Sequence, residues 1–516
     1  MLYTLAALVS LLLLTIYFLI LPLLTYIYDA KNLRKYPNFA PLSGITDLPY
    51  CALSAQGFRS KDLHSAHKHA PILRIGPNSL SFGRTAAIKD IYGHSTPCLK
   101  DIKYAVTWGS HTHLFDSIDK AEHAEKRKRM AAAFAIKNLE RWEHKVASST
   151  GRLLTVLDGL CTGPLLDEDS KVSPADLTVD FNKWINLFTI EAINNIALSS
   201  SLGLLEQGSD VVTAQRKDGS TYTARYRESQ DNTAYAQSVF VWDYRNYQWL
   251  ARLPRLLPKW RRVWRDGEPW GDVIYHQAQT RLQRYENGEN LDDFFARLMD
   301  DKAGQPNQLE WGEIVAEVGA IINAGADTTA IALTQVVDLL IQHPKELQKL
   351  REEVDTALDE DEVIAPYDKV RNLPFLRACL DEALRLIPPT SAGLPRRTPA
   401  EGASIMGRWI PGDTSVSMTI YSAHRDPDVF PNPEEYCPGR WMDPEERKRM
   451  EPFFVAFSTG ARGCLGRNIT YLEQTVVLAS LVHRYEFARP SNWTLRRHEA
   501  FNMLLGEMPI KIWRRR

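Results

Sequence analysis

A glycine-rich loop with one cysteine is the stretch whose residue types could do chemistry most directly. It reads Phe-Ser-Thr-Gly-Ala-Arg-Gly-Cys-Leu-Gly from Phe457 to Gly466 and leads into a helical pattern over 468–481. A Cys464 thiolate at a helix start would meet the positive end of the helix dipole, which lowers its pKa and favours metal binding. The glycines permit tight turns and close approach of the backbone to a large flat ligand. Arg462 would suit an anionic group on that ligand.

Two other functions would suit parts of this loop. A dinucleotide-binding loop needs the order G-x-G-x-x-G after a buried strand, but Gly460, Gly463 and Gly466 follow the order G-x-x-G-x-x-G. An ordinary loop with a buried free cysteine would explain Cys464 alone and leave the other matched positions without a reason. The whole spacing, F-x-x-G-x-R-x-C-x-G, resembles the haem-binding loop of the cytochrome P-450 family, in which the cysteine is the axial ligand of the iron.

Composition limits the classes of protein to which the chain can belong. It has 516 residues, of which 44% are hydrophobic and 24% charged, as in a globular protein with a sizeable core. The net charge of −1 gives no overall field that would attract nucleic acid, so no nucleic-acid partner is expected. The six cysteines contain no C-x-x-C pair, which argues against a disulfide scaffold and a zinc ribbon and fits a reducing compartment.

The N-terminal residues 2–28 carry no charge and consist mostly of Leu, Ile, Val, Ala, Phe and Tyr. About 20 apolar residues span a bilayer, and no basic start or small-x-small cleavage site indicates a removed signal peptide. We therefore expect residues 1–28 to form a retained transmembrane anchor. Lys31, Arg34 and Lys35 follow at once, and the positive-inside rule then places the rest of the chain in the cytosol.

The segment 29–50 is expected to be a stiff, extended basic linker, because proline disfavours helix in the residue before it. Its prolines are Pro37, Pro41 and Pro49. Residues 51–516 would then form the catalytic domain. Near its start, residues 71–82 read as two short strands around a Gly-Pro-Asn turn.

The middle of the chain alternates apolar and polar stretches. Residues 177–202 and 292–299 read as core helices, and 216–232 as a polar loop. The segment 240–270 is rich in tryptophan and arginine, which would fit a nucleic-acid surface. A membrane-facing region is the more economical interpretation, because both residue types suit the headgroup layer and an anchor is already expected.

A basic stretch from His123 to Phe134 favours a helix by propensity. His123 and Arg127 are four residues apart and share one face of it. In the family that the cysteine loop resembles, a Trp or His followed four residues later by Arg binds a haem propionate, which implies this role for the pair. The other basic residues of the run would then line the side where an acidic electron donor docks. A solvated basic face is the alternative.

A long helix is predicted from about Glu313 to Gln342, where His-Pro ends it. Small residues at its middle would let a flat ligand and a diatomic molecule lie against the backbone. Thr328 can donate back to the carbonyl of Ala324, which bends a helix. Asp327 and Thr328 at such a bend make a proton path to bound oxygen. The pattern A-G-x-D-T-T resembles the oxygen-activating helix of the same family; a buried helix kinked by polar residues is the alternative.

Glu382 and Arg385 lie three residues apart on a predicted helix that ends at Pro-Pro. They resemble the E-x-x-R pair of the family, which binds an arginine of a later P-x-R-[FW] segment. Arg440 fits that segment, so the resemblance assigns Glu382, Arg385 and Arg440 to structure and haem-pocket formation. A further propionate-binding arginine would be Arg396. Phe457 and Gly466 complete the residues expected to contact the haem.

The resemblance covers almost the whole chain after residue 35. It implies a mainly α fold with a small β region, the cytochrome P-450 fold with an N-terminal transmembrane helix. It also implies haem b with an axial Cys464 thiolate, O2 as co-substrate, and electrons from a separate NADPH-cytochrome reductase, because no flavin or NADPH domain is recognisable. The expected place is the endoplasmic reticulum membrane, single-pass, with the catalytic domain cytosolic.

Several segments look like fungal benzoate 4-hydroxylases and secondary-metabolism members of the family. Mostly neutral pocket positions are expected near 108–113, 318–328, 390–394 and 501–505, which suits an apolar small-molecule substrate. The predicted activity is therefore monooxygenation of such a molecule in fungal secondary metabolism. The alternatives are hydroxylation of a simple aromatic acid such as benzoate, a haem-thiolate isomerase or dehydratase that needs no reductase, and a membrane-tethered haem or sterol binder without catalysis.

Overall fold

The longest apolar helical pattern forms the centre of the molecule. The computed structural model describes residues 2–107, 109–131, 133–165, 172–301 and 303–515. In it α15 (Trp311–Gln342) is almost wholly buried over its second half, which confirms the helix predicted over 313–342. Against α15 pack α8 (Phe181–Leu198), α18 (Pro374–Leu386) and α21 (Arg467–Arg484), and their apolar side chains form the main hydrophobic core.

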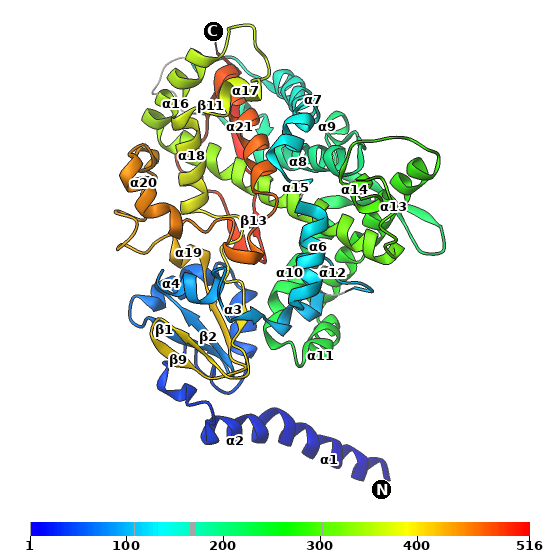
Figure 1. Ribbon diagram of the computed structural model, residues 1–516, viewed down its shortest axis with the longest axis vertical. Helices are drawn as coiled ribbons and strands as arrows, with labels where there is room; N and C mark the ends of the chain where they lie inside the picture. The colour runs from blue at the N-terminus through cyan, green and yellow to red at the C-terminus, as the bar shows by residue number, and fades with distance from the viewer. Residues whose placement is uncertain (1, 108, 132, 166–171, 302, 516) are drawn as a thin grey trace.

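Helices make up most of the molecule, and a small sheet region lies near one end (Figure 1). Pro344 stands in the first turn of α16, where its missing N–H costs nothing, and so separates α16 from α15. The other α-helices of the described residues are α1 (Leu2–Thr15), α2 (Leu21–Tyr28), α3 (Leu48–Ser54), α4 (Arg59–His67), α5 (Ala87–Tyr92), α6 (Lys120–Ala131), α7 (Ile136–Leu160), α9 (Leu204–Gln207), α10 (Tyr226–Phe240), α11 (Tyr247–Arg252), α12 (Pro258–Gly267), α13 (Pro269–Glu286), α14 (Phe294–Met299), α16 (Pro344–Ala357), α17 (Tyr367–Val370), α19 (Ile420–Ala423) and α20 (Pro444–Met450).

Five short strands from distant parts of the chain form the main sheet, in the order β1-β2-β10-β7-β3. They are β1 (Ile72–Gly76), β2 (Ser79–Phe82), β10 (Ser415–Met418), β7 (Arg396–Arg397) and β3 (Leu99–Lys100). The hairpin predicted over 71–82 is confirmed, and β2 pairs with β10 in parallel. At the edge of the sheet Lys100 of β3 lies directly opposite Arg396 of β7. Two cations thus face each other across paired strands.

Smaller sheets brace the helices. A three-stranded sheet joins β11 (Tyr485–Ala488), β14 (Pro509–Arg514) and β4 (Val179–Asp180). A hairpin of β12 (Arg497–Glu499) and β13 (Met503–Leu505) carries Phe501 and Asn502 at its tip. Two further hairpins pair β5 (Val211–Gln215) with β6 (Thr221–Arg225) and β8 (Ala403–Ile405) with β9 (Arg408–Ile410).

The N-terminal residues form a helix that projects along one end of the catalytic domain (Figure 1), which it contacts through Tyr17, whose hydroxyl donates to Asn246 over 3.1 Å. Residues 3–28 are long and apolar enough to cross a membrane and are not buried against the rest of the chain. Within the described residues, α15 is the other helix that passes the same test, but most of it is buried in the core. Length and composition therefore make residues 3–28 the candidate membrane anchor.

The segment after the anchor packs against the catalytic domain, whereas its prolines predict an extended linker. Leu33 and Tyr36 are buried in the small core beneath the main sheet, and Asn38 pairs with Arg74 of β1. Pro49 lies in the first turn of α3, a position that proline tolerates, so the expectation of a fully non-helical linker to residue 50 is wrong at its end.

One other sequence expectation needs correction, and the tryptophans of a second segment divide between core and surface. The polar loop expected over 216–232 instead forms the second strand of the β5–β6 hairpin and the first turns of α10. Of the tryptophans in the segment 240–270, Trp249 is exposed while Trp242 is buried against Tyr50. Most of these indoles therefore serve packing, since aromatic rings bury a large area and stack on each other.

Candidate functional site

The loop that precedes α21 holds Cys464 in a fixed backbone path. The Cys464 N–H donates to the Phe457 carbonyl over 2.9 Å, which closes the loop on itself. Gly460 has a φ of +72°, and a Cβ there would lie 2.1 Å from the Tyr92 carbonyl oxygen. Only glycine fits that position. A Cβ on Gly466 would lie 3.7 Å from the Cys464 sulfur, so its absence keeps the surroundings of the sulfur open.

The Cys464 thiol opens onto space inside the domain. It has accessible surface, although protein atoms surround it on all sides. Burial raises the pKa of Cys464, and the Gly466 and Arg467 amides and the Arg127 guanidinium act in the opposite direction. The helix start alone therefore does not give the lowered pKa that the sequence favoured. A coordinated metal ion would supply the missing positive charge, because it deprotonates a bound thiol outright.

Four side chains of lysine and arginine and one histidine gather beside this loop, and we call them the cationic cluster. Burial is the main cause that lowers the pKa of His123 to about 4, and the charges of the other four members act in the same direction. Among the described residues, no carboxylate lies within 4 Å of a nitrogen of any member. The members are Lys100, His123, Arg127, Arg396 and Arg462. Like charges gathered without counter-ions are costly unless an anion joins them.

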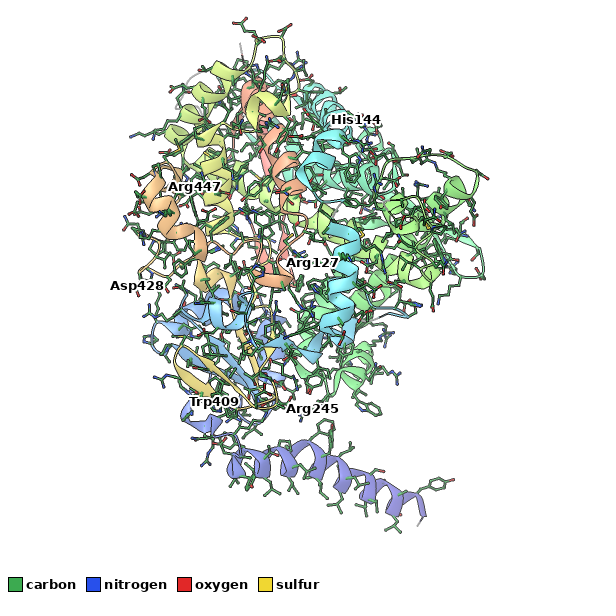
Figure 2. All side chains as sticks on the ribbon, viewed as in Figure 1. Arg127, His144, Arg245, Trp409, Asp428 and Arg447 are labelled. Carbon is green, nitrogen blue, oxygen red and sulfur yellow. The ribbon has the colours of Figure 1, made fainter. Side chains whose placement is uncertain are left out.

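Each arginine of the cluster is held by backbone carbonyls. Arg127 donates to the Gly463 carbonyl over 2.7 Å, which ties α6 to the cysteine loop at the middle of the molecule (Figure 2). Arg462 donates to the Ile118 carbonyl over 3.0 Å, and Arg396 to the Pro395 carbonyl over 3.2 Å. These bonds orient the guanidinium groups but leave their charges unneutralised.

The middle of α15 presents one open position. Ala324 is exposed, whereas Ala326 is buried and a Cβ on Gly325 would lie 2.5 Å from Ile193 of α8. Gly325 therefore serves the close packing of two helices, and Ala324 alone opens toward a ligand. The Thr328 hydroxyl donates to the Ala324 carbonyl over 2.7 Å, as predicted. This back-bond occupies a carbonyl of the helix ladder at the open position.

Asp327 points away from that open position into a polar cluster. Its Oδ2 accepts from the Asn502 amide over 2.7 Å, and its Oδ1 lies 3.5 Å from Arg227 of α10. Burial raises the pKa of Asp327 to about 6, although Arg227 and Asn502 act in the opposite direction. Asn502 also accepts from Thr390 over 2.7 Å. The carboxyl group thus joins three segments and titrates in the range useful for proton transfer.

Glu382 and Arg385 form a completely buried ion pair. Two nitrogens of Arg385 each lie 2.9 Å from a Glu382 oxygen, and Arg440 Nε lies 2.9 Å from Glu382 Oε1. The geometry expected from the E-x-x-R pattern is confirmed. The Trp441 indole also donates to Glu382 over 2.9 Å, and Arg385 donates to the carbonyls of His424, Pro433 and Glu435.

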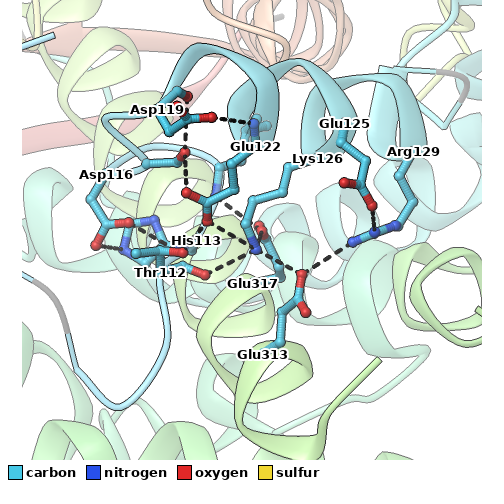
Figure 3. A network of polar contacts seen from close by, with 12 residues as sticks. Thr112, His113, Asp116, Asp119, Glu122, Glu125, Lys126, Arg129, Glu313 and Glu317 are labelled. Atoms are coloured by element: carbon cyan, nitrogen blue, oxygen red, sulfur yellow. Dashed lines mark hydrogen bonds and ion pairs between the residues drawn. The ribbon is translucent and has the colours of Figure 1, made fainter. Parts of the chain in front are cut away.

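The basic run of α6 is mostly turned inward, as Figure 3 shows. Lys126 lies 2.7 Å from Glu313 and 3.5 Å from Glu317, both on α15. Arg129 lies 3.2 Å from Glu313. Of the four basic residues that follow Glu125, only Lys128 is exposed. The expectation that this run as a whole lines a docking face is therefore wrong. Its charges bind α6 to α15.

The predicted pocket segments meet one another. Asn502 contacts both Asp327 and Thr390, and the Phe501 ring lies 5.4 Å from the Phe115 ring. Phe115 in turn lies 5.5 Å from Tyr104 and keeps 40% of its surface exposed. Of the segment expected at 108–113, Trp108 lies outside the described residues. The rings of Tyr104, Phe115 and Phe501 therefore form a continuous row, which we call the aromatic wall, beside the segments expected to contact substrate.

Sequence reasoning missed the contacts of four residues of this site. Arg227 lies 100 residues from Asp327, and Asn502, which falls in the expected pocket segment 501–505, lies 175 residues from it. Neither residue follows a local pattern that would indicate Asp327 as its partner. Trp441 belongs to the same P-x-R-[FW] segment as Arg440, but that pattern does not predict its hydrogen bond to Glu382. Lys100 follows no sequence motif, and its position opposite Arg396 is apparent only from the pairing of β3 with β7.

The residues present fit a haem. A cysteine sulfur is the donor that a haem-thiolate centre needs, and it opens onto interior space. The cationic cluster lacks carboxylate partners, which suits two propionate groups. Ala324 is exposed at the middle of α15, and Gly466 leaves room beside the Cys464 sulfur.

The chain belongs to the cytochrome P450 family, whose model matches residues 85–512. It is 29% identical over 492 residues to a cytochrome P450 monooxygenase of Aspergillus terreus, covering 90% of this chain and 93% of that protein. It is 27% identical over 499 residues to the benzoate 4-monooxygenase of Aspergillus niger, covering 93% and 92%. A crystal structure of a cytochrome P450 shares the fold at a TM-score of 0.68 and 18% identity, covering 93% of this chain and 99% of that one.

These findings define the protein as a haem-thiolate monooxygenase with the cytochrome P450 fold. Membership of the family implies a haem whose iron is bound by a cysteine thiolate. The N-terminal apolar helix is a candidate membrane anchor.

Proposed function

We propose that this protein is a membrane-anchored monooxygenase that hydroxylates or oxidises an apolar small molecule in fungal secondary metabolism. Electrons would come from an NADPH-dependent reductase, and O2 would be the co-substrate. The observation that carries the proposal is the joint presence of an accessible Cys464, a cationic cluster without counter-ions, and an open position at Ala324 on α15. Relatives named as fungal P450 monooxygenases support it.

Cys464 would bind the iron of haem b, and the cationic cluster would bind its propionates. When bound, the haem supplies oxygen activation, which the electron push of a thiolate favours. His123, Arg127, Arg396 and Arg462 would hold the propionate edge by charge-assisted hydrogen bonds. Phe457 and Gly466 would adjoin the face that carries the sulfur. Glu382, Arg385 and Arg440 would keep the surrounding segments in place without contacting substrate.

Asp327 and Thr328 would hold and move protons at the middle of α15. A carboxyl with a pKa of about 6 can give up and regain a proton near neutral pH. The Thr328 hydroxyl, bonded to Ala324, would position that proton at the open face of α15. Arg227 and Asn502 would fix the orientation of the Asp327 carboxyl, because each contacts a different oxygen.

Replacing Thr328 by alanine removes the hydroxyl and leaves the iron ligand unchanged. We expect the Thr328→Ala protein to keep its haem while the ratio of product formed to NADPH consumed falls about 10-fold or more and peroxide accumulates, since a positioned proton donor contributes about 100-fold or more. Thr328→Ser retains the hydroxyl and should restore coupling. Undiminished coupling in Thr328→Ala would contradict the proton-path role.

The outer surface supports attachment to a membrane on one side. Exposed apolar side chains lie on α11 at Trp249 and just after it at Leu253, Leu256 and Leu257. Arg245 and the exposed Trp409 lie at the end of the domain that adjoins the N-terminal helix (Figure 2). Tryptophan and arginine suit the headgroup layer. We propose a single-pass anchor in the endoplasmic reticulum with a cytosolic catalytic domain; release of full-length protein by alkaline carbonate would contradict the anchor.

Reconstitution tests the activity. The full chain with a fungal NADPH-dependent reductase should consume a compound from extracts of a strain that lacks this gene, and only when NADPH and O2 are both present. Turnover without reductase would favour the isomerase or dehydratase alternative. Benzoate belongs in the same assay, because one relative is named a benzoate 4-monooxygenase.

A further inference from the structure

The loop that carries Phe115 of the aromatic wall is held through its backbone by two helices. The Lys126 ammonium of α6 donates to the Thr112 carbonyl over 3.1 Å (Figure 3). Two residues further along the loop, the Leu114 N–H donates to Glu317 Oε1 of α15 over 3.0 Å. Phe115 follows directly. The place of its ring therefore depends on side chains that lie outside the loop.

Lys126 is the charge that joins these contacts. Its nitrogen lies 2.7 Å from Glu313 and 3.5 Å from Glu317. Glu122, 4.0 Å away, accepts from the Thr112 hydroxyl. In the part of the chain that the structure describes, Lys126 is the one lysine or arginine within 4 Å of Glu317. A buried carboxylate needs a partner, so loss of this ammonium would leave Glu317 uncompensated beside the loop.

Glu317 and the open position at Ala324 lie on the same face of α15. They are seven residues apart, which is nearly two full turns of the helix and about 10 Å along its axis. The loop is therefore fixed over the helix face that carries Ala324. The Phe115 ring keeps 40% of its surface exposed beside this face. A molecule of about that length at Ala324 would reach the aromatic wall.

We propose that Lys126 is a positioning residue for a ring-bearing substrate: through Thr112 and Glu317 it fixes the loop that presents Phe115 to the pocket. The proposal rests on the proposed function, since it needs a substrate beside a haem that Cys464 binds. It goes beyond that function because it assigns a buried cation of α6, remote from the iron ligand, to the choice of substrate.

The class of substrate follows from the wall itself. The Phe115 ring stands edge-on to Tyr104 at 5.5 Å and to Phe501 at 5.4 Å. Rings in such edge-to-face arrays offer a further flat ring the same kind of contact, which exceeds the gain from burial alone. A substrate with at least one aromatic ring therefore gains from a correctly placed Phe115, and a small aliphatic molecule does not.

Imidazole and 1-benzylimidazole are suitable probes, because both bind haem iron through a ring nitrogen and only the second carries a phenyl ring. Their dissociation constants are measured on full-length holoprotein without reductase, from the absorbance change of the haem. We expect Lys126→Met to weaken 1-benzylimidazole relative to imidazole by about 2- to 10-fold, the usual effect of one aromatic pair. Lys128→Met, on the exposed side of the same helix, is the matched control and should leave this preference unchanged.

The Phe115→Leu variant tests whether Lys126 acts through the wall. Alone it should lower the preference for 1-benzylimidazole by a similar factor. Lys126→Met should then add little in the Phe115→Leu background, because two changes along one chain of contacts are not additive. Additive losses would show that Lys126 acts elsewhere. An unchanged preference in either single variant would overturn the proposal.

Two changes at Glu317 answer the same question if Lys126→Met fails to fold. Glu317→Gln retains an oxygen for the Leu114 N–H and should keep the preference for 1-benzylimidazole. Glu317→Met removes that acceptor, while Lys126 keeps Glu313 as its partner, and should lower the preference. Equal preferences in these two variants would contradict the dependence of the loop on this bond.

The proposed function can fail separately. If the unchanged holoprotein gives no thiolate-type carbon monoxide band, the haem-thiolate site is wrong, whatever the two probes show. A normal band in Lys126→Met together with an unchanged preference overturns only the assignment of Lys126.

Discussion

The Cys464→Ser protein is expected to lose the carbon monoxide difference band of a thiolate-ligated haem completely, and with it all reductase-dependent turnover. Serine keeps the size and the backbone path of the loop, which depends on the Cys464 N–H and on Gly460 rather than on the sulfur. It cannot donate electron density as a thiolate does. The band should be recorded on dithionite-reduced protein, and haem content by pyridine haemochrome.

Cys437→Ser is the matched control for this change. Cys437 is a free, exposed cysteine, and its contact with Glu382 is made by the backbone N–H, which serine retains. We expect an unchanged band and unchanged stability within about 0.5 kcal/mol, as for most surface substitutions. A thiolate band that survives in Cys464→Ser would show that another residue binds the iron and would remove the basis of the proposed site.

The Arg385→Met protein is expected to be less stable by about 3–5 kcal/mol, the cost of breaking a buried ion pair. Arg385 is completely buried and donates to Glu382 and to the carbonyls of His424, Pro433 and Glu435. Methionine leaves those acceptors without their donor. Since whole domains are stable by only about 5–15 kcal/mol, we expect a low yield of folded holoprotein. Urea unfolding followed by tryptophan fluorescence measures the loss.

Two further variants separate the ion pair from simple loss of a long side chain. Arg447→Met removes an arginine of α20 for which no side-chain partner is found among the described residues (Figure 2), and stability should change by about 0.5 kcal/mol or less. Glu382→Gln combined with Arg385→Met should cost less than the sum of the single changes, because the two residues contact each other. An additive double change would contradict the coupled role.

Sequence patterns predicted those parts of the site in which the contacting residues lie close together in the sequence. The cysteine loop, the back-bond of Thr328 to Ala324 and the pair Glu382–Arg385 each depend on residues within a few positions of one another. The helix periods and proline stops likewise placed α15 and α18 within a few residues of their observed ends. Such features need no knowledge of the tertiary fold.

The predictions that were missed or wrong concern residues whose surroundings are set by distant parts of the chain. Lys126 looked like a solvated charge, but it lies inside because Glu313 and Glu317 of a distant helix meet it. The polarity of residues 216–232 gave no indication that alternate residues would pair across a hairpin. The pKa of Cys464 was expected to fall at a helix start, but burial outweighs the helix amides. Each outcome depends on neighbours that are far away in the sequence.

The four residues that donate to Glu382 also constrain the order in which the chain can be assembled. Trp441 stands 59 residues after Glu382, so at the usual rates of translation about 3 to 12 s pass before the carboxylate can obtain its last partner. Cys464 is synthesised later still. Until then the segment between α18 and α20 stays incomplete and its buried charges stay hydrated, and the iron ligand becomes available only after the partners of Glu382 are complete.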